Sequence, residues 1–304
     1  VAATPFSSHT PNDLPIYSAC PFGVAPSAGF SDTTSTDVDC VAYYGITKGT
    51  TATTYSPFDH VSRWQMALFL TRMTGPSGIT LPNGSVQGFT DIVNYSPEIQ
   101  TAINQIKQLG ITVGKTATTF APADKVTREE MALFISRFLT KATPGTGGNL
   151  EYISGVSGSK EIKSIDSDHN FSDINQGLME GRAAIVNLWN LGVTDVQGAI
   201  TYEPTNPMTR QAMATFIKGA LDHTNARPKG VNMQAASTSD NRVQGTPTLG
   251  LLVTHRSDSF QPIAGTRIDT FKFTHTALTT VSRFDTSGRC HIALAPTTNT
   301  VATS

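Results

Sequence analysis

The sequence predicts a multidomain α+β protein in which three helix-loop-helix repeats form an all-α bundle and a small all-β domain follows them. Two observations predict this architecture. One segment is written three times along the 304-residue chain, as "VSRWQMALFLTRM", "VTREEMALFISRF" and "MTRQAMATFIKGA". After "NARPKGVNMQ" the chain changes to β-branched, partly alternating runs such as "TLGLLVTHR" and "RIDTFKFTH", which are typical of strands.

The repeat is defined by fixed offsets from three arginines, Arg63, Arg128 and Arg210. Each unit has a proline six residues before the arginine, a glycine eighteen before it, a methionine three after it and a phenylalanine six after it, and opens with a Phe-x-Asp motif. These residues are Pro57, Pro122 and Pro204; Gly45, Gly110 and Gly192; Met66, Met131 and Met213; Phe69, Phe134 and Phe216; and the motifs of Phe30 and Asp32, Phe89 and Asp91, and Phe171 and Asp173. One helical pair cannot bury its own apolar face, so we expect the three units to pack together.

Each repeat is predicted to contain two helices joined by a loop. The first helix ends at the glycine of "LGIT" or its counterpart. The second begins at a Ser or Thr before the arginine, where Ser62 with Gln65, and Thr127 with Glu130, form predicted capping boxes and Thr209 keeps only the cap. Apolar residues at helical spacing predict the buried face of the second helix: Met66, Phe69, Leu70 and Met73, matched by Met131, Phe134, Ile135 and Phe138.

The repeats divide the chain into six predicted segments. These are an extended N-terminal segment at 1–29, repeat 1 at 30–75, repeat 2 at 88–142, a Gly/Ser-rich insertion at 143–170, repeat 3 at 171–224 and the β domain at 235–304. Cys20 and Cys40 are predicted to form a disulfide in an oxidising compartment, with Cys290 left over. The first ten residues lack a Met, a basic region and an apolar region, so we expect an exported chain from which a signal peptide has been removed.

The repeated arginine occupies the first position of each predicted second helix. A cation there is unfavourable by about 0.3–1 kcal/mol, because the free N–H groups and the dipole of a helix N-terminus favour an anion. Because arginine nevertheless occupies this position in all three repeats, we expect it to have a role that offsets this cost. Two interpretations remain open. Each arginine pairs with a carboxylate of the protein, such as a Phe-x-Asp carboxylate of a neighbouring repeat. Alternatively, the arginines line a pocket for an acidic ligand that the planar guanidinium binds through two N–H groups.

Residues 30–73, 89–138 and 171–220 resemble three S-layer homology modules in the opening Phe-x-Asp, the "GIT" turn, the "P-x5-R" loop and the "TREE"-like start of the last helix. The resemblance implies a pseudo-threefold helical bundle within one chain. It also implies non-covalent binding of an acidic cell-wall polysaccharide, often carrying ketal-linked pyruvate, in grooves between modules. Glycan-binding roles carry over to the matching positions, which are Arg63, Arg128 and Arg210, Asp32, Asp91 and Asp173, and Gly49 and Gly114.

This chain departs from the family pattern in two repeats. In the third, Val196 stands where the others have glycine, which puts that groove in doubt. The first repeat is shorter and carries Cys40 inside its first predicted helix. Trp64, beside Arg63, is a candidate for stacking on a sugar ring and equally for packing at the surface, whereas Trp189 is expected in the core.

Two further regions carry weaker signals. The segment from "PIAGTRIDTFKF" through "FDTSGRC" resembles bacterial immunoglobulin-like modules of surface proteins, but roughly 70 residues is short for a seven-stranded sandwich. A strand from elsewhere or from a neighbouring subunit is expected to complete it. Asp166, Asp168 and Asn170 in "DSDHNFSD" offer oxygen ligands for calcium, but the EF-hand pattern is missing, so we favour a solvated acidic loop and keep calcium as the alternative.

Other function classes find little support. Charged residues make up 15% of the chain with a net charge of −1, which gives no sign of nucleic-acid binding, and no apolar run reaches the roughly 18–20 residues of a membrane span. Ser157 and Lys160 have the spacing of a Ser/Lys nucleophile pair but lie in the Gly/Ser-rich insertion without supporting motifs. The sequence has no Gly-rich phosphate loop, HExxH or CxxC motif, so we expect neither an enzyme nor a cofactor.

The sequence therefore predicts an extracellular cell-envelope protein that binds an anionic wall polysaccharide through three modules and self-associates in a surface layer or similar assembly. The alternative is a structural building block of a filament, sheath or virion that uses the same modules for subunit contacts without binding glycan.

Overall fold

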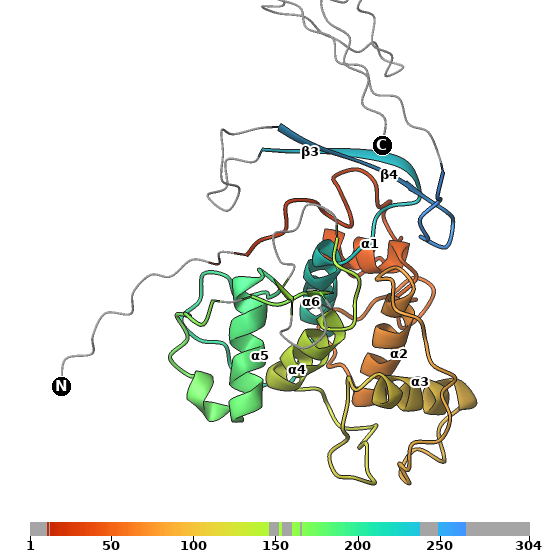
Figure 1. Cartoon of the computed structure of the whole chain (residues 1–304). Helices are drawn as coiled ribbons and strands as arrows, with labels where there is room; N and C mark the ends of the chain where they lie inside the picture. The colour runs from red at the N-terminus through yellow and green to blue at the C-terminus, as the bar shows by residue number, and fades with distance from the viewer. Residues whose placement is uncertain are drawn as a thin grey trace, which may run out of the picture. The chain divides into compact units, whose positions relative to one another are not determined.

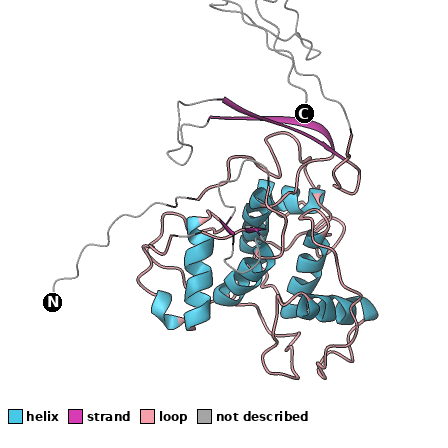
Figure 2. Cartoon of the chain, in the orientation of Figure 1, coloured by secondary structure: helices cyan, strands magenta, loops and turns pink. Residues whose placement is uncertain are grey.

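The computed structural model describes residue 11 and residues 13–145, 152–153, 160–164, 166–237 and 249–265. These residues form six α-helices, one short 3-10 helix and two two-stranded antiparallel sheets (Figures 1 and 2). The predicted class is confirmed as a mixed α+β chain that is mostly helical. Ser157, Cys290 and residues 266–304, which hold most of the predicted β domain, lie outside the described residues.

The helices come in three pairs along the chain. The pairs are α1 (Thr36–Tyr43) and α2 (Arg63–Thr74), α3 (Pro97–Gln108) and α4 (Arg128–Leu139), and α5 (Met179–Asn190) and α6 (Arg210–His223), with the 3-10 helix η1 (Ile174–Gln176) before α5. The predicted capping boxes of Ser62 with Gln65 and of Thr127 with Glu130 are both formed, and Thr209 caps α6 by accepting a hydrogen bond from the Ala212 amide. Local capping therefore sets the start of all three second helices.

The second helix of each pair packs against the first helix of another pair. Helix α2 packs on α3, α4 on α5, and α6 returns to pack on α1, so the three pairs close on one another (Figure 1). Trp189 is fully buried, as expected. The predicted apolar stripes form the core, with exposed fractions of 4% or less for Met66, Phe69, Leu70, Met73, Met131, Phe134, Ile135 and Phe138.

A closed ring of three backbone hydrogen bonds joins the loops that precede α2, α4 and α6. The amide of Val61 donates to the carbonyl of Met208 at 3.0 Å, that of Met208 to Val126 at 2.7 Å, and that of Val126 to Val61 at 2.9 Å. All three residues are fully buried. A buried backbone group needs a partner, so each of these loops depends on the other two.

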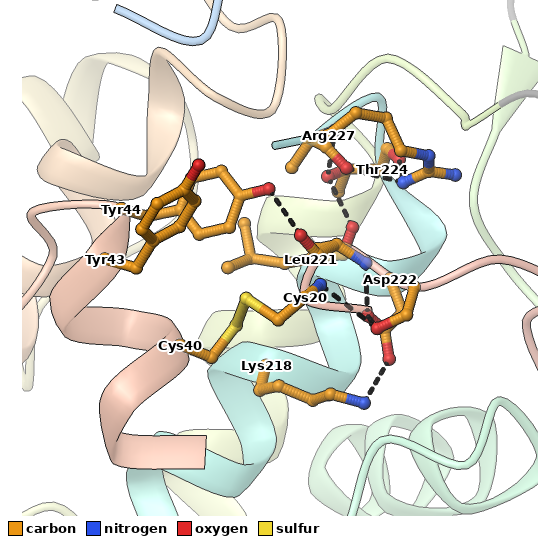
Figure 3. Close-up of a disulfide and its surroundings, with 12 residues drawn as sticks. Cys20, Cys40, Tyr43, Tyr44, Lys218, Leu221, Asp222, Thr224 and Arg227 are labelled. Atoms are coloured by element: carbon orange, nitrogen blue, oxygen red, sulfur yellow. Dashed lines mark hydrogen bonds and ion pairs between the residues drawn. A yellow bond between two sulfur atoms is a disulfide. The ribbon is translucent and has the colours of Figure 1, made fainter. Parts of the chain in front are cut away.

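Residues 13–29, the N-terminal strap, contain no helix or strand and are tied to the helices by side-chain contacts. The predicted disulfide between Cys20 of the strap and Cys40 of α1 is present, with the Cα atoms 5.9 Å apart (Figure 3). Asp222 of α6 accepts hydrogen bonds from the amide of Ala19 at 2.7 Å, and the Tyr44 hydroxyl donates to the Ala19 carbonyl at 2.7 Å. The strap thus fastens the end of α6 to the end of α1.

The two sheets are both hairpins. In the predicted Gly/Ser-rich insertion, β1 (Tyr152–Ile153) pairs with β2 (Lys160–Glu161). Strands β3 (Gly230–Ser237) and β4 (Leu249–Arg256) pair over their whole length, from Gly230 opposite Arg256 to Ser237 opposite Leu249. The predicted strand run "TLGLLVTHR" is therefore β4.

The β3–β4 hairpin is held against α1. The Lys229 amide donates to the Tyr43 hydroxyl at 3.0 Å, and the ring of Phe260, just after β4, lies 4.4 Å from that of Tyr44. The hairpin accordingly belongs to the same compact unit as the helices.

Candidate anion-binding sites

The side chain of each repeated arginine reaches out of its own helix pair into another one. Arg210 reaches the first pair, Arg63 the second and Arg128 the third, and we call these positions site 1, site 2 and site 3. All three arginines are buried, with exposed fractions of 3%, 3% and 8%.

Each site has an inner half, around the arginine Nε and the aromatic rings, and an outer half, around the terminal nitrogens. The inner half is built in the same way in all three sites. The arginine Nε donates to the backbone carbonyl of an aromatic residue: Tyr55 at 2.7 Å in site 1, Phe120 at 2.8 Å in site 2 and Tyr202 at 2.7 Å in site 3. The guanidinium lies 4.7–4.8 Å from the ring centroid of that residue. A second ring, that of Phe69, Phe134 or Phe216, lies 5.3–6.0 Å away. Aromatic faces attract a weakly hydrated guanidinium, which explains how three cations are accommodated here.

The outer half differs in its carboxylates. In site 3, Asp195 binds Arg128 through both oxygens, at 2.9 Å to Nη1 and 2.7 Å to Nη2. In site 2, one oxygen of Glu130 accepts from Arg63 Nη1 at 3.0 Å and also from Lys115. In site 1, no carboxylate of the described residues forms an ion pair with Arg210. The three arginines are therefore compensated to three different degrees.

The pKa shifts of the three arginines separate Arg128, which has the bidentate carboxylate, from the other two. Burial lowers the pKa of Arg63 and of Arg210, because removing water disfavours the charged form. Burial acts on Arg128 as well, but the hydrogen bonds and charge of Asp195 outweigh it and raise the pKa of Arg128.

The helix N-termini themselves do not offer free N–H groups at their first two positions, contrary to the sequence-based expectation. The amides of Arg63 and Trp64 donate to the carbonyls of Asp124 and Pro122, at 2.9 and 3.0 Å. At the start of α4, the first two amides donate to the carbonyls of Asn206 and Pro204. At the start of α6, they donate to the carbonyls of Asp59 and Pro57. Neighbouring backbone thus occupies the place that an anion would take.

The Phe-x-Asp aspartates hold the loops that the arginines contact. Asp32 accepts from the amides of Tyr55 and Ser56, both at 2.8 Å. Asp91 and Asp173 do the same for Phe120 with Ala121 and for Tyr202 with Glu203. Of the two open interpretations, the version in which these aspartates pair with the arginines does not hold, because their oxygens accept from backbone amides. The aspartates fix the residue whose carbonyl receives the arginine.

The Asp32 carboxylate is expected to make stability depend on acid pH. Amide hydrogen bonds, first that of Tyr55, lower the pKa of Asp32 below its unfolded value of about 3.9. Ionised Asp32 therefore stabilises the fold above that value, and this stabilisation is lost as the pH falls through the folded-state pKa. Thermal unfolding of the wild type and Asp32→Asn from pH 2 to 7 should give a difference in Tm that shrinks at the acid end. A difference independent of pH would contradict this assignment.

Gly49 and Gly114 are required by backbone geometry. Their φ angles are +78° and +88°, and a Cβ on Gly114 would lie 2.6 Å from the carbonyl oxygens of Thr116 and Thr119 and from the Phe89 ring. In the third repeat Val196 replaces this glycine, and the loop there takes a different turn, closed by a hydrogen bond from the Ala199 amide to the Val196 carbonyl.

A pocket of about 380 Å³ opens at site 2. Arg63, Gly114, Lys115 and Phe134 line it together with Leu178 and Glu180 from the start of α5. Its charged groups are largely paired, since Glu130 binds Arg63 and Lys115, and Glu180 binds Arg137.

The remaining sequence-based candidates are Trp64 and the acidic residues before the third repeat. Trp64 is half-buried and packs against the core. Among the described residues no group of three or more His, Cys, Asp or Glu is placed to hold a metal ion. Of the residues suggested for calcium, Asp166 accepts a hydrogen bond from the Asp168 amide at 2.9 Å.

Sequence reasoning missed the carboxylate partners of the arginines, Glu130 and Asp195. It also missed the aromatic residues that accept from the arginine Nε, which are Tyr55, Phe120 and Tyr202. The sequence identified Glu130 only as a capping residue. It does cap the helix, since one oxygen accepts from the Thr127 amide, while the other oxygen binds Arg63. Asp195 had one indirect signal, its position next to the unusual Val196.

The S-layer homology domain family matches residues 88–132 of this chain. Over 91 residues, or 29% of the chain, the sequence is 42% identical to a protein named endoglucanase from Bacillus sp. (strain KSM-635), and the match spans 9% of that relative's length. The resemblance to S-layer homology modules is confirmed by these matches, neither of which gives evidence of a catalytic domain here. Such a domain indicates association with the cell surface or cell wall. None of the helices described in the structure combines the length and the apolar character needed to cross a membrane.

Proposed function

We propose that this chain, which contains an S-layer homology domain, is an extracellular cell-envelope protein that binds an acidic cell-wall polysaccharide, such as a pyruvylated one, without a covalent bond. In this proposal it also self-associates in a surface layer or a similar assembly. The role is binding rather than catalysis. The observation that carries the proposal is the state of Arg210, a buried arginine without a carboxylate partner among the described residues.

The geometry of site 1 suits a carboxylate ligand. The Nε bond to Tyr55 and the two aromatic rings fix the guanidinium plane. In the described part of the chain, the terminal nitrogens of Arg210 have no hydrogen-bond partner. They are also not among the described polar atoms that are buried without a partner, so they are accessible to solvent. Two parallel N–H groups in that position match the two oxygens of a carboxylate.

The surroundings of site 1 favour an anion more than those of site 2. Lys48 precedes Gly49 and is exposed, whereas Val113 precedes Gly114 in the loop that lines the site 2 pocket. Gln65 stands in the first repeat at the position of Glu130, so the carboxylate that neutralises Arg63 has no counterpart at Arg210. Site 1 thus lacks the acid that neutralises Arg63 in site 2.

Arg210→Ala is expected to weaken binding to purified cell walls by about tenfold or more, because a buried charge-assisted pair with the glycan is lost. Arg210→Lys keeps the positive charge but not the planar pair of N–H groups, so its affinity should be only partly restored relative to Arg210→Ala. Sedimentation with walls whose acidic polysaccharide is intact measures the effect.

Arg182→Ala is the matched control, since within the described residues Arg182 of α5 bonds only to the carbonyls of Gly177 and Asn175. Circular dichroism and Tm establish that each variant is folded. Amidating the wall carboxylates should abolish binding by the wild type. Unchanged binding by folded Arg210→Ala would show that site 1 does not hold the glycan.

The alternative, a structural building block whose modules serve subunit contacts without glycan, is favoured by a different observation. Arg63 and Arg128 each have a carboxylate of the chain within hydrogen-bond distance. Electron microscopy and light scattering of the purified protein without glycan distinguish the two, because the alternative requires ordered assembly under that condition and no wall binding.

A further inference from the structure

We infer that Asp195 takes the place of the ligand's carboxylate in site 3 and thereby closes that site to acidic polysaccharide. The inference rests on the proposed function, because it supposes that a carboxylate of the glycan binds at the outer half of these sites. It adds that the three sites are unequal and names the residue that disables one of them.

The contacts of Arg128 show that site 3 is otherwise built like site 1. The Nε bond to Tyr202 is 2.7 Å long, as is that of Arg210 to Tyr55, and the guanidinium lies 4.8 Å from the Tyr202 ring and 6.0 Å from that of Phe216. Only the outer edge differs, where both Asp195 oxygens occupy the two terminal nitrogens. This is the bidentate geometry that a carboxylate ligand would adopt.

The position of Asp195 in the repeat supports a specific role. Lys48, Val113 and Asp195 each lie three residues after the glycine that ends the first helix of their repeat. A cation, a neutral residue and an anion therefore stand at the same position in sites 1, 2 and 3. The side chain of Asp195 is 26% exposed while that of Arg128 is 9% exposed, so the carboxylate sits at the mouth of the site over a buried cation.

An internal carboxylate excludes an external one for two physical reasons. It is attached to the same chain, so it competes at an effective concentration that a dilute ligand does not reach. A second carboxylate brought to the same guanidinium would also lie beside the first, and like charges at that distance repel. A ligand can enter site 3 only if Asp195 is displaced or absent.

Asp195→Val tests the inference, because valine is the residue that repeat 2 carries at this position. The probe is the methyl galactoside that bears a 4,6-linked pyruvate ketal, titrated by calorimetry into the full chain. The Asp195→Val variant is expected to bind one probe molecule more per chain than the wild type. Adding Arg128→Lys to Asp195→Val should weaken binding at the gained site, because lysine keeps the charge but not the two parallel N–H groups.

Two further variants keep the test decisive. Asp258→Val makes the same charge change on an exposed turn after β4 and should leave the number of bound probe molecules unchanged. Asp195→Asn removes the charge while preserving an oxygen acceptor, so it should bind the additional probe more weakly than Asp195→Val, and it serves if the valine variant does not fold.

The outcomes separate this inference from the proposed function. If the wild type binds the probe through Arg210 and both folded Asp195 variants bind the same number of molecules, Asp195 is a structural ion-pair partner and the inference is wrong. If the wild type does not bind but Asp195→Val does, the proposed function fails at site 1 while the inference stands. If no variant binds the probe, both are wrong.

Discussion

Replacing both Cys20 and Cys40 by Ser is expected to lower the free energy of unfolding by about 3 kcal/mol, the loop-closure value for a bridge spanning 20 residues. The bridge holds the N-terminal strap, which has no helix or strand of its own, against α1. Without it, the ordering of the strap depends on hydrogen bonds such as those of Ala19 to Asp222 and Tyr44, and that of the Ala28 amide to Asp39. Guanidinium chloride unfolding followed by circular dichroism measures the loss.

Two controls accompany the cysteine variant. The wild type treated with a reducing agent should reproduce its lower midpoint, and Cys290→Ser should leave the midpoint unchanged, because Cys290 is not part of the bridge. A double serine variant within about 1 kcal/mol of the wild type would mean that the strap is held by its other contacts.

Gly114→Ala is expected to cost about 3 kcal/mol or more, because a Cβ there overlaps backbone as well as a ring. The overlapped atoms are the carbonyl oxygens of Thr116 and Thr119 and an edge carbon of Phe89, all 2.6 Å away. The oxygens belong to the chain that closes the loop, so they cannot rotate aside as a flexible side chain would. Thermal unfolding should show a drop in Tm of many degrees.

Gly110→Ala is the matched control for this prediction. Gly110 also has a left-handed φ, +73°, but a Cβ there meets nothing within 4 Å. Its substitution should therefore cost only the conformational term, about 1 kcal/mol. Equal losses at the two positions would show that backbone conformation alone, rather than the close approach, demands glycine at Gly114.

The elements of the helical part could be predicted from the sequence because their causes are local. Thr127 and Glu130 satisfy the amide groups of one helix start, and Met131 with Phe134 defines its buried face, all within a few residues of one another. The Cys20–Cys40 bridge was predictable because the two cysteines are close in sequence and few others compete for them.

The composition of the arginine sites could not be predicted because it depends on contacts between residues far apart in the chain. Arg128 and Asp195 are separated by 67 positions, and Arg210 and Tyr55 by 155. The repeat pattern identified three equivalent arginines, but not that their carboxylates would differ. Only the folded arrangement shows that Asp32 binds a backbone loop while Glu130 and Asp195 bind guanidinium groups.

The return of α6 to α1, together with the ring of Val61, Val126 and Met208, has a consequence for how this part of the molecule forms. In a linear array of repeats each unit can fold on its immediate neighbour, and stability grows by increments. Here α1 meets its packing partner about 170 residues downstream, so no subset of the repeats contains its own complete core. The three helix pairs are therefore expected to fold as one cooperative unit, because truncating any pair removes a packing partner from both of the others.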